Sequence, residues 1–381
     1  MAVMRKAVAT LGPNDVIVVS YNLLQRKKDD FAEQRWATVV LDEAQYVKNA
    51  DADRTKSVKK LRRDFTIALT GTPVENDLGE LHAIVDLAFP GLLADERVFR
   101  DTFRRPIEMR GDKERLAILG RLLGPFLLRR TRGAVLDELP AREEVTELID
   151  LSDEERKRYL TLRKVVEEDI ARQKQSGIGP GVMRIELLAA LTRLRQLACE
   201  VRLLDPEYHG PSTKTGRVVE LAQQLAGEGN AALVFSQFTS FLTLVRDALV
   251  KAGLRVAYLS GETPLPARQA LIDEFQAGKY DVFCISLLAG GTGLNLTHAS
   301  YVVHLDPWWN PAAEEQATAR AHRMGQKNPV TVYRLVSRGT IEEAVLKLHA
   351  RKRQLAAAVL EGRGEASKVS SEELLAILGV E

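Results

Sequence analysis

The sequence predicts an α/β protein with two parallel-sheet lobes, the first of them incomplete, and with helical insertions. Short β-branched segments alternate with helical patterns near the start of the chain and again from residue 232 onward. This alternation is typical of parallel strands joined by helices. The first series offers only about three strands, fewer than the five or six that are usual in a doubly wound sheet.

Residues 1–150 are predicted to form the incomplete first lobe together with a helical protrusion. A helix running through residue 35 is expected between the first two strands. Apolar residues recur at helical spacing from residue 78 to about 124, which predicts the protrusion. The β-branched runs predict strands at residues 16–20, 38–41 and 66–69.

The rest of the chain is predicted to contain a helical insertion, a complete second lobe and a helical tail. Helical spacing from residue 152 to 200, broken by SGIGPG at 176–181, defines the insertion as 151–211. The second lobe spans 212–340, and the tail spans 341–381. Strands of the second lobe are expected at residues 232–235, 255–259, 282–286, 301–305 and 330–335.

The composition is that of a packed globular protein. The chain has 381 residues, 45% hydrophobic and 28% charged, with a formal charge of +2. Any nucleic-acid contact must therefore come from local Lys and Arg clusters. Cys199 and Cys284 are isolated, which argues against a disulfide framework or a zinc site. No apolar run reaches the roughly 18 residues of a membrane span, so we expect a cytoplasmic, nucleoid-associated protein without a membrane partner.

Two adjacent carboxylates follow the second predicted strand. In TVVLDEAQ, residues 38–45, Asp42 and Glu43 stand where open α/β sheets place ligand-binding groups. One carboxylate can hold Mg²⁺ while the other polarises an attacking water, as phosphoryl transfer requires. An ordinary acidic strand end is the competing interpretation.

Three further segments have a weaker signal when taken alone. In IALTGTPVEN, residues 67–76, Thr70 and Thr72 are placed to hydrogen-bond toward Glu43 or a phosphate, although a plain strand-turn also fits. The glycine-rich run at residues 286–300 allows close backbone approach to a phosphate. In QATARAHRMGQ, residues 316–326, a helix would place Arg320 and Arg323 on one face. Two guanidiniums there suit a transferring phosphoryl group, although a solvated basic face is the alternative.

The order and spacing of these segments are more specific than any one of them. LDEAQ, LTGTPVEN, LVFSQF, SLLAGGTGLNL, DPWWNP and QATARAHRMGQ follow one another, and FLLRRTRGAVLDELP stands at residues 126–140. From about residue 16 to 360 the sequence resembles the Swi/Snf-type ATPases of helicase superfamily two. The resemblance implies two RecA-like lobes that close on ATP and move along double-stranded DNA.

The resemblance also implies roles for individual residues. Asp42 would hold Mg²⁺, Glu43 would activate water, and Arg320 and Arg323 would be arginine fingers. Trp309 is equally compatible with a core position. The remaining nucleotide-side positions are Gln45, Thr70, Gly71, Thr72, Gly291 and Gln316. The positions expected to face DNA or the cleft between lobes are Gln237, Thr292, Asn295 and Trp308.

Three departures from the family pattern limit what the resemblance implies. Leu288 stands where similar proteins usually carry Lys, and Ala319 where they carry Asp. The sequence contains no GxxxxGK[ST] phosphate-binding loop. ATP and Mg²⁺ would therefore need a P-loop from outside these residues, from an upstream segment or a partner chain.

An ATP-dependent double-stranded DNA translocase is expected if that loop is supplied. Otherwise the chain is a non-catalytic DNA-binding or regulatory remnant, and no feature favours a protein-interaction module.

Overall fold

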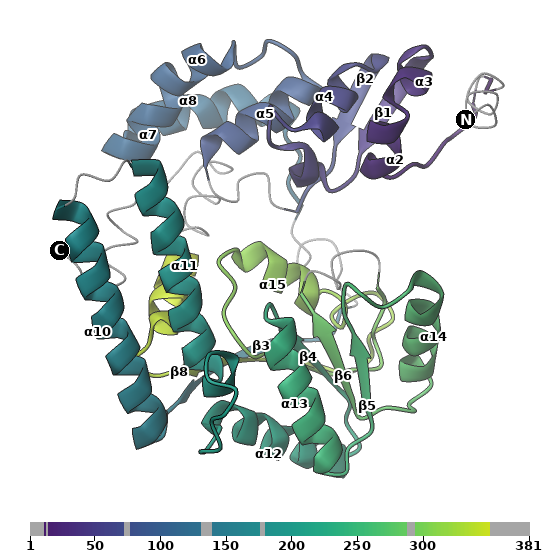
Figure 1. The fold of residues 1–381 in the computed structure, drawn as a ribbon. Helices are drawn as coiled ribbons and strands as arrows, with labels where there is room; N and C mark the ends of the chain where they lie inside the picture. Colours follow the sequence, from purple (N-terminus) through teal and green to yellow (C-terminus); the bar gives the residue numbers. More distant parts are fainter. Residues whose placement is uncertain are drawn as a thin grey trace. The chain divides into compact units, whose positions relative to one another are not determined.

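The computed structural model describes residues 11–12, 14–71, 77–130, 139–175, 180–287 and 294–350. The chain divides into two compact units, with the boundary after Arg129. Their helices and strands are labelled in Figure 1. Across these residues, no helix is both long and apolar enough to cross a lipid bilayer.

The described part of the first unit contains a parallel sheet of two strands, β1 (Arg35–Leu41) and β2 (Arg62–Ala68). Both strands were predicted, and both begin several residues before their β-branched runs because polar residues at a strand's start give no hydrophobic signal. Ser20 Oγ caps the first helix by accepting a hydrogen bond from the Leu23 N–H at 3.2 Å. The short elements around the sheet are α2 (Tyr21–Arg26), α3 (Lys28–Ala32), η1 (Ala44–Val47) and α4 (Asp53–Lys59).

The strand predicted at residues 16–20 is wrong. These residues have no regular secondary structure. Val16 and Val18 are 86% and 92% exposed, while Ile17 and Val19 pack against the core of the unit. This alternation produced the period-two signal, but among the described residues β1 and β2 pair only with each other and not with this segment.

The two faces of the β1–β2 sheet differ. Leu41 is buried in a core with helices α2 to α5, and its neighbour Ala68 packs against that core. On the opposite face, Val40 and Ile67 are register partners and both are exposed. Phe65 and Leu69, at alternating positions of the same face, are also exposed. One side of this sheet is therefore apolar and uncovered.

Helices form in the first unit where apolar residues recur at helical spacing, between residues 78 and 126. Aspartate side chains accept N–H hydrogen bonds at the starts of three of its helices: Asp77, Asp95 and Asp112. Leu81, Phe99 and Leu119 are among the residues of its buried core. The elements are α5 (Leu78–Ala88), α6 (Glu96–Phe99), the π-helical η2 (Arg100–Arg104), α7 (Arg105–Arg110), α8 (Lys113–Leu123) and η3 (Gly124–Phe126).

The second unit is built on a six-stranded parallel sheet in the order β3-β8-β7-β4-β6-β5. The five predicted strands are confirmed. The strands are β3 (Arg142–Ile149), β4 (Ala232–Ser236), β5 (Val256–Leu259), β6 (Val282–Ser286), β7 (Tyr301–His304) and β8 (Val330–Ser337).

Strand β3 was not predicted, and it shifts the unit boundary. It lies within the 1–150 segment expected to belong to the first lobe, but it pairs along its whole length with β8. Its sequence, REEVTELI, is rich in charged residues, as is common in edge strands. It therefore has no apolar run from which a strand could be predicted. Arg142 and Glu144 use their charges in ion pairs with Glu315 and Arg334.

Helices cover both faces of this second sheet. Along β4, Leu233 and Phe235 belong to one buried cluster, while Ala232 and Val234 belong to another. The first cluster includes residues of α14 (Leu265–Gln276), and the second includes residues of α12 (Thr213–Gly227) and α13 (Thr239–Lys251). Such double coverage is the usual state of a parallel sheet.

The predicted helical insertion forms a helix pair within the second unit. Helices α10 (Asp153–Gln175) and α11 (Pro180–Cys199) lie side by side in Figure 1 and share a buried core. A short η4 (Val201–Leu203) follows. Later come α15 (Pro311–Thr318) and a helical run at residues 341–350. The rest of the predicted tail lies outside the described residues.

Candidate functional site

Asp42 and Glu43 directly follow β1, at the carboxyl end of the first sheet. Asp42 is exposed. Glu43 has φ 48° and ψ 53°, in the left-handed region that non-glycine residues seldom adopt. Such strain persists where the surroundings enforce it and often marks functional positions. Here the Ala44 N–H donates to the Leu69 carbonyl at 2.8 Å, which fixes the turn against β2.

A chain of hydrogen bonds orients the Glu43 carboxylate. Gln45 Nε2 donates to Glu43 Oε2 at 2.6 Å, and Thr70 Oγ1 donates to Gln45 Oε1 at 2.7 Å. Thr70 was expected to bond toward Glu43, and it does so through Gln45, which is 8% exposed. The ends of the two strands are thereby linked through side chains, and Glu43 is held in one orientation.

Tyr21 belongs to this cluster although no sequence signal indicated it. Its hydroxyl donates to the Asp42 carbonyl oxygen at 2.8 Å. Burial, with the charges of Asp42 and Glu43, raises the pKa of Tyr21 to about 12, so the hydroxyl stays protonated and remains a donor. Gly71 is exposed beside Thr70.

The donor set fits Mg²⁺ only in part. Within the described ranges, no three His, Cys, Asp or Glu residues gather closely enough to hold a metal ion alone. Mg²⁺ commonly takes only one or two carboxylates and completes its shell with phosphate oxygens and water. The exposed carboxylate of Asp42 suits that role, with Glu43 beside it.

The second unit presents its candidate DNA-facing residues where β4 and β7 end. Gln237 follows β4, and its Oε1 accepts a hydrogen bond from Arg195 Nη1 at 3.1 Å, so the amide is turned toward α11. The Trp308 N–H donates to Glu314 Oε1 at 2.8 Å. Trp309 packs against the α10–α11 core, which supports a core position for that ring. Asn295 is exposed, and Gln316 is half-buried on α15.

The arginine pair does not share a helix face, so that geometric prediction is wrong. Helix α15 ends at Thr318, and Arg320 and Arg323 lie in the turns that follow. The Ala321 N–H donates to the Thr318 carbonyl at 3.1 Å, a tighter turn than an α-helix makes. Arg320 is only 8% exposed, whereas Arg323 is exposed. The Arg320 carbonyl accepts the Leu296 N–H at 2.9 Å.

Two further residues hold this turn in place and were not predicted. Gln326 Nε2 donates to the carbonyl oxygens of Thr297, Ala299 and Ala321 at 2.8–3.2 Å. His322 Nε2 lies 2.9 Å from the Pro140 carbonyl oxygen. The Gln326 side chain could have been suspected from its place at the end of QATARAHRMGQ, but its three partners depend on the fold. The predicted residues Thr72, Gly291 and Thr292, and the departure at Leu288, lie outside the described residues.

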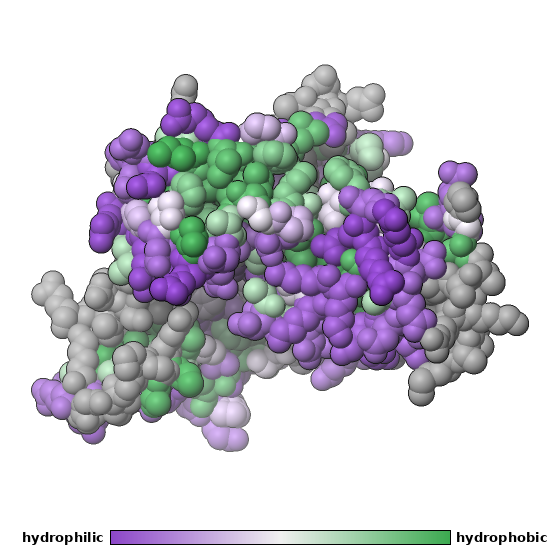
Figure 2. Space-filling view, turned by 90° about the horizontal axis from the view of Figure 1, so that it is seen from above, coloured by the Kyte–Doolittle hydropathy of each residue, from purple (hydrophilic) through white to green (hydrophobic). Residues whose placement is uncertain are grey.

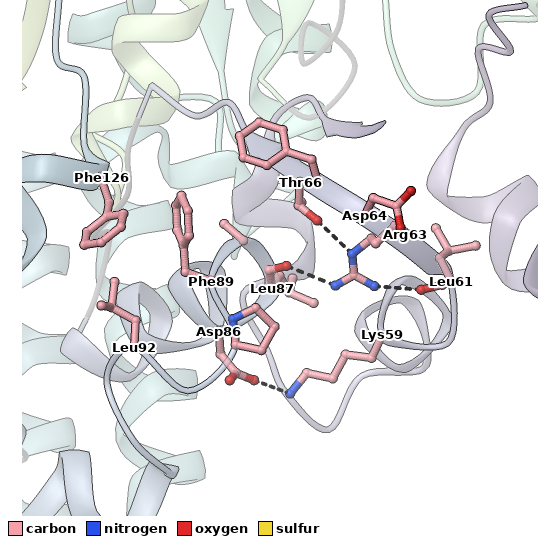
Figure 3. A pocket seen from close by; sticks show the side chains of 13 residues that line it. Lys59, Leu61, Arg63, Asp64, Thr66, Asp86, Leu87, Phe89, Leu92 and Phe126 are labelled. Carbon is pink, nitrogen blue, oxygen red and sulfur yellow. Dashed lines mark hydrogen bonds and ion pairs between the residues drawn. The ribbon is translucent and has the colours of Figure 1, made fainter. Parts of the chain in front are cut away.

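A cavity of about 730 Å³ lies beside β2 and does not include the predicted nucleotide residues. Figure 3 shows Phe89, Leu92 and Phe126 on one side of it and the Lys59–Asp86 ion pair, 2.7 Å long, on the other. Arg63 donates to the Leu87 carbonyl at 3.0 Å, and burial lowers its pKa. The cavity therefore has aromatic walls and charged walls of both signs, with Asp64 and Asp86 beside Lys59 and Arg63.

Comparison with protein families decides the assignment. Residues 3–203 match the SNF2-related domain. The chain belongs to the SNF2 family. Residues 214–325 match the helicase conserved C-terminal domain. The predicted resemblance to Swi/Snf-type ATPases is confirmed, and so is the fold of two parallel-sheet units with helical segments.

Named SNF2-family relatives are helicases and chromatin regulators. The putative ATP-dependent helicase/translocase YwqA of Bacillus subtilis is 35% identical over 94% of this chain and 39% of its own length. The mouse SWI/SNF-related matrix-associated actin-dependent regulator of chromatin subfamily A member 1 is 33% identical over 96% of this chain and 36% of its own. The chain thus spans less than two-fifths of each of these relatives.

A solved SNF2-family structure has a similar fold. The Sulfolobus solfataricus SWI2/SNF2 ATPase core in complex with double-stranded DNA is 30% identical, with a TM-score of 0.51. The match covers 95% of this chain and 76% of that one. About a quarter of the solved core therefore has no counterpart among these 381 residues.

Proposed function

We propose that this chain is part of an ATP-dependent motor that moves along double-stranded DNA. The observation that carries the proposal is the hydrogen-bonded set Glu43, Gln45 and Thr70 at the carboxyl edge of β1. A carboxylate held in one orientation beside an exposed Asp42 is what water activation next to a bound cation requires.

Each candidate residue has a separate task in this proposal. Asp42 would hold Mg²⁺, which neutralises charge on the phosphates, and Glu43 would orient and deprotonate the attacking water. Arg323, exposed on its turn, would approach the transferring phosphoryl group, and Arg320 would shape that turn from its buried position. The solved relative bound to double-stranded DNA supports the choice of partner.

The phosphate-binding loop would come from a segment outside residues 1–381 or from a partner chain. The sequence contains no GxxxxGK[ST] motif, the loop that supplies backbone donors and a lysine around the β- and γ-phosphates. The uncovered face of β1–β2 supports this part of the proposal, because exposed Val40, Phe65, Ile67 and Leu69 would be covered by a docked segment. In the view of Figure 2, exposed hydrophobic side chains lie next to one another and are bordered by hydrophilic ones.

The competing function is a non-catalytic DNA-binding or regulatory protein, which the complete second unit favours. Its six-stranded sheet and its buried core need no further segment. In that case the chain would bind DNA, but it would not hydrolyse ATP even after a phosphate-binding loop had been added to it.

The proposed motor requires DNA binding without sequence preference, so this is the first test. Labelled duplexes of unrelated sequence are titrated between about 50 and about 200 mM salt. Because a translocase tracks backbone phosphates, affinity should fall steeply with salt, roughly a hundredfold or more over this range. An affinity that does not depend on salt, or a strong preference for one duplex, would contradict the proposal.

A further inference from the structure

A buried arginine from the helical insertion reaches the carboxyl edge of the second sheet. Arg195 lies on α11, and its side chain is 3% exposed. Its Nη2 donates to the Pro307 carbonyl oxygen at 2.6 Å, and its Nη1 donates to Gln237 Oε1 at 3.1 Å. Pro307 follows β7 and Gln237 follows β4, so one side chain bonds to both strand-end loops.

Asp306 ties the same two loops together. Its Oδ1 accepts hydrogen bonds from Ser236 Oγ at 2.5 Å and from the Gln237 N–H at 3.3 Å. Its Oδ2 lies 3.7 Å from Arg195 Nη2. Asp306 is 1% exposed, and its burial raises its pKa to about 6, while Arg195 acts to lower it. Without the arginine, this carboxylate would be buried with no cation this close, which is costly.

Two aromatic rings, one from each loop, contact the same guanidinium. The Arg195 Cζ atom lies 5.0 Å from the centre of the Trp309 ring and 5.5 Å from that of Phe238. Cations over aromatic faces are attracted by the ring. A planar guanidinium can stack on rings while its N–H groups bond in fixed directions, which a lysine ammonium cannot do.

The Trp308 backbone is held in place through its two neighbours in sequence, Pro307 and Trp309. On one side Arg195 holds Pro307, and on the other Trp309 packs against the guanidinium. The Trp308 N–H bonds to Glu314, and its carbonyl oxygen accepts from His349. The Trp308 ring is half-buried and packs against one core cluster of the second sheet, and the backbone that carries it is held by Arg195 through both of its neighbours.

We propose that Arg195 is a positioning residue for DNA binding. Its side chain holds loops 236–238 and 306–309 so that Trp308 faces the duplex. Because Arg195 lies on α11, it also links the position of these loops to that helix. The inference rests on the proposed function, since it assumes that this edge contacts DNA. None of the DNA-facing positions expected from the sequence lies on the helical insertion.

The test compares Arg195→Lys and Arg195→Met with the parent chain, residues 1–381 in all cases. DNA affinity should fall roughly tenfold in both variants. The slope of the logarithm of the binding constant against the logarithm of the salt concentration should not change, because a buried positioning residue neutralises no phosphate. A residue that contacted phosphate directly would lower the slope by about 0.9 when its charge is removed.

A matched control separates positioning from general destabilisation. Leu249 is fully buried near the end of α13, in the core on one face of the same sheet. Leu249→Ala should lower the urea midpoint of unfolding yet leave DNA affinity at the parent value. Arg195→Lys, which keeps the charge, should lose affinity even where its urea midpoint stays near that of the parent.

Tryptophan emission gives a readout that does not need DNA. The chain has three tryptophans, Trp36, Trp308 and Trp309, so a Trp36→Phe background reports the two at this edge. Arg195→Lys should shift that emission, and Leu249→Ala should not. Parent affinity in both Arg195 variants, an unshifted emission, or a lowered salt slope in Arg195→Met would overturn the inference. A parent chain that binds no duplex at any salt concentration would instead overturn the proposed function.

Discussion

The two parallel sheets differ in how much of their surface the chain covers. In the second unit, every residue of β4 and β6 is buried, with helices packed on both faces. In the first unit, Val40, Phe65, Ile67 and Leu69 are between 39% and 55% exposed on one face of β1–β2. The second sheet is complete by the usual rule for parallel strands, and the first is not.

This difference bears on function because the candidate catalytic carboxylates belong to the uncovered sheet. Asp42 and Glu43 end β1, whereas the loops with Gln237 and Trp308 end strands of the covered one. DNA binding should therefore be a property of the chain as it stands. Catalysis should depend on whatever covers the first sheet and brings the phosphate-binding loop.

The largest effect is expected at Arg323, and it requires a preparation completed with a phosphate-binding segment. Arg323→Ala should lower the ATP hydrolysis rate roughly a thousandfold, since fingers stabilise transition-state charge. Stability should change little because the residue is exposed, and DNA affinity should change little if the side chain faces the phosphoryl group and not the duplex. Arg320→Ala should lower the rate comparably and also destabilise the turn, because it removes a side chain that is only 8% exposed. Parent rates in both variants would show that the finger assignment is wrong.

Breaking a buried ion pair in the second unit should lower the unfolding free energy far more than breaking an exposed ion pair in the first unit. In the second unit, Lys214 Nζ lies 2.7 Å from Glu342 Oε2, and both side chains are fully buried. Lys214→Met would leave Glu342 buried without its cation, and unfolding free energy should drop by about 3–5 kcal/mol. In the first unit, the Arg35–Asp64 pair is exposed, and Arg35→Met should give no measurable change. Urea denaturation followed by circular dichroism measures both, and equal losses would contradict the comparison.

A smaller effect is expected from one methyl group in each sheet. Ile285 in β6 is fully buried, whereas Ile67 in β2 is 39% exposed. Ile285→Val should cost about 1 kcal/mol of unfolding free energy, and Ile67→Val much less. If a phosphate-binding segment covers β1–β2, the Ile67→Val cost should rise toward that of Ile285→Val in the completed protein. If Ile67→Val costs the same unfolding free energy in the completed protein as in the chain alone, the phosphate-binding segment does not cover β1–β2.

The fold was largely predictable from sequence because buried parallel strands are short runs of mainly apolar residues. The five strands from residue 232 onward have this signal, and the charged edge strand β3 does not. Residues 16–20 show the opposite failure, since they alternate like a strand but are not part of a ladder. Sequence reasoning sees side-chain periodicity and does not see whether a neighbouring strand exists.

The candidate site was predictable as residue types and less so as geometry. The relation of Thr70 to Glu43 was anticipated, but the bridging Gln45 amide came from the structure. The shared helix face of Arg320 and Arg323 followed from spacing alone and fails because α15 ends at Thr318. Tyr21, Gln326 and Arg195 act through backbone carbonyls or buried partners that lie distant in sequence. Such partners leave no local pattern.

The central claim is that these 381 residues bind DNA but hold only part of an ATP site. The most direct measurement is phosphate release by the chain alone, with and without duplex DNA, beside its Glu43→Gln variant. We expect no DNA-stimulated hydrolysis above background in either protein, in preparations that bind duplex DNA. Turnover of about 1 per second or faster that is stimulated by DNA and lost in Glu43→Gln would contradict the account, because it would place a complete ATP site within this chain.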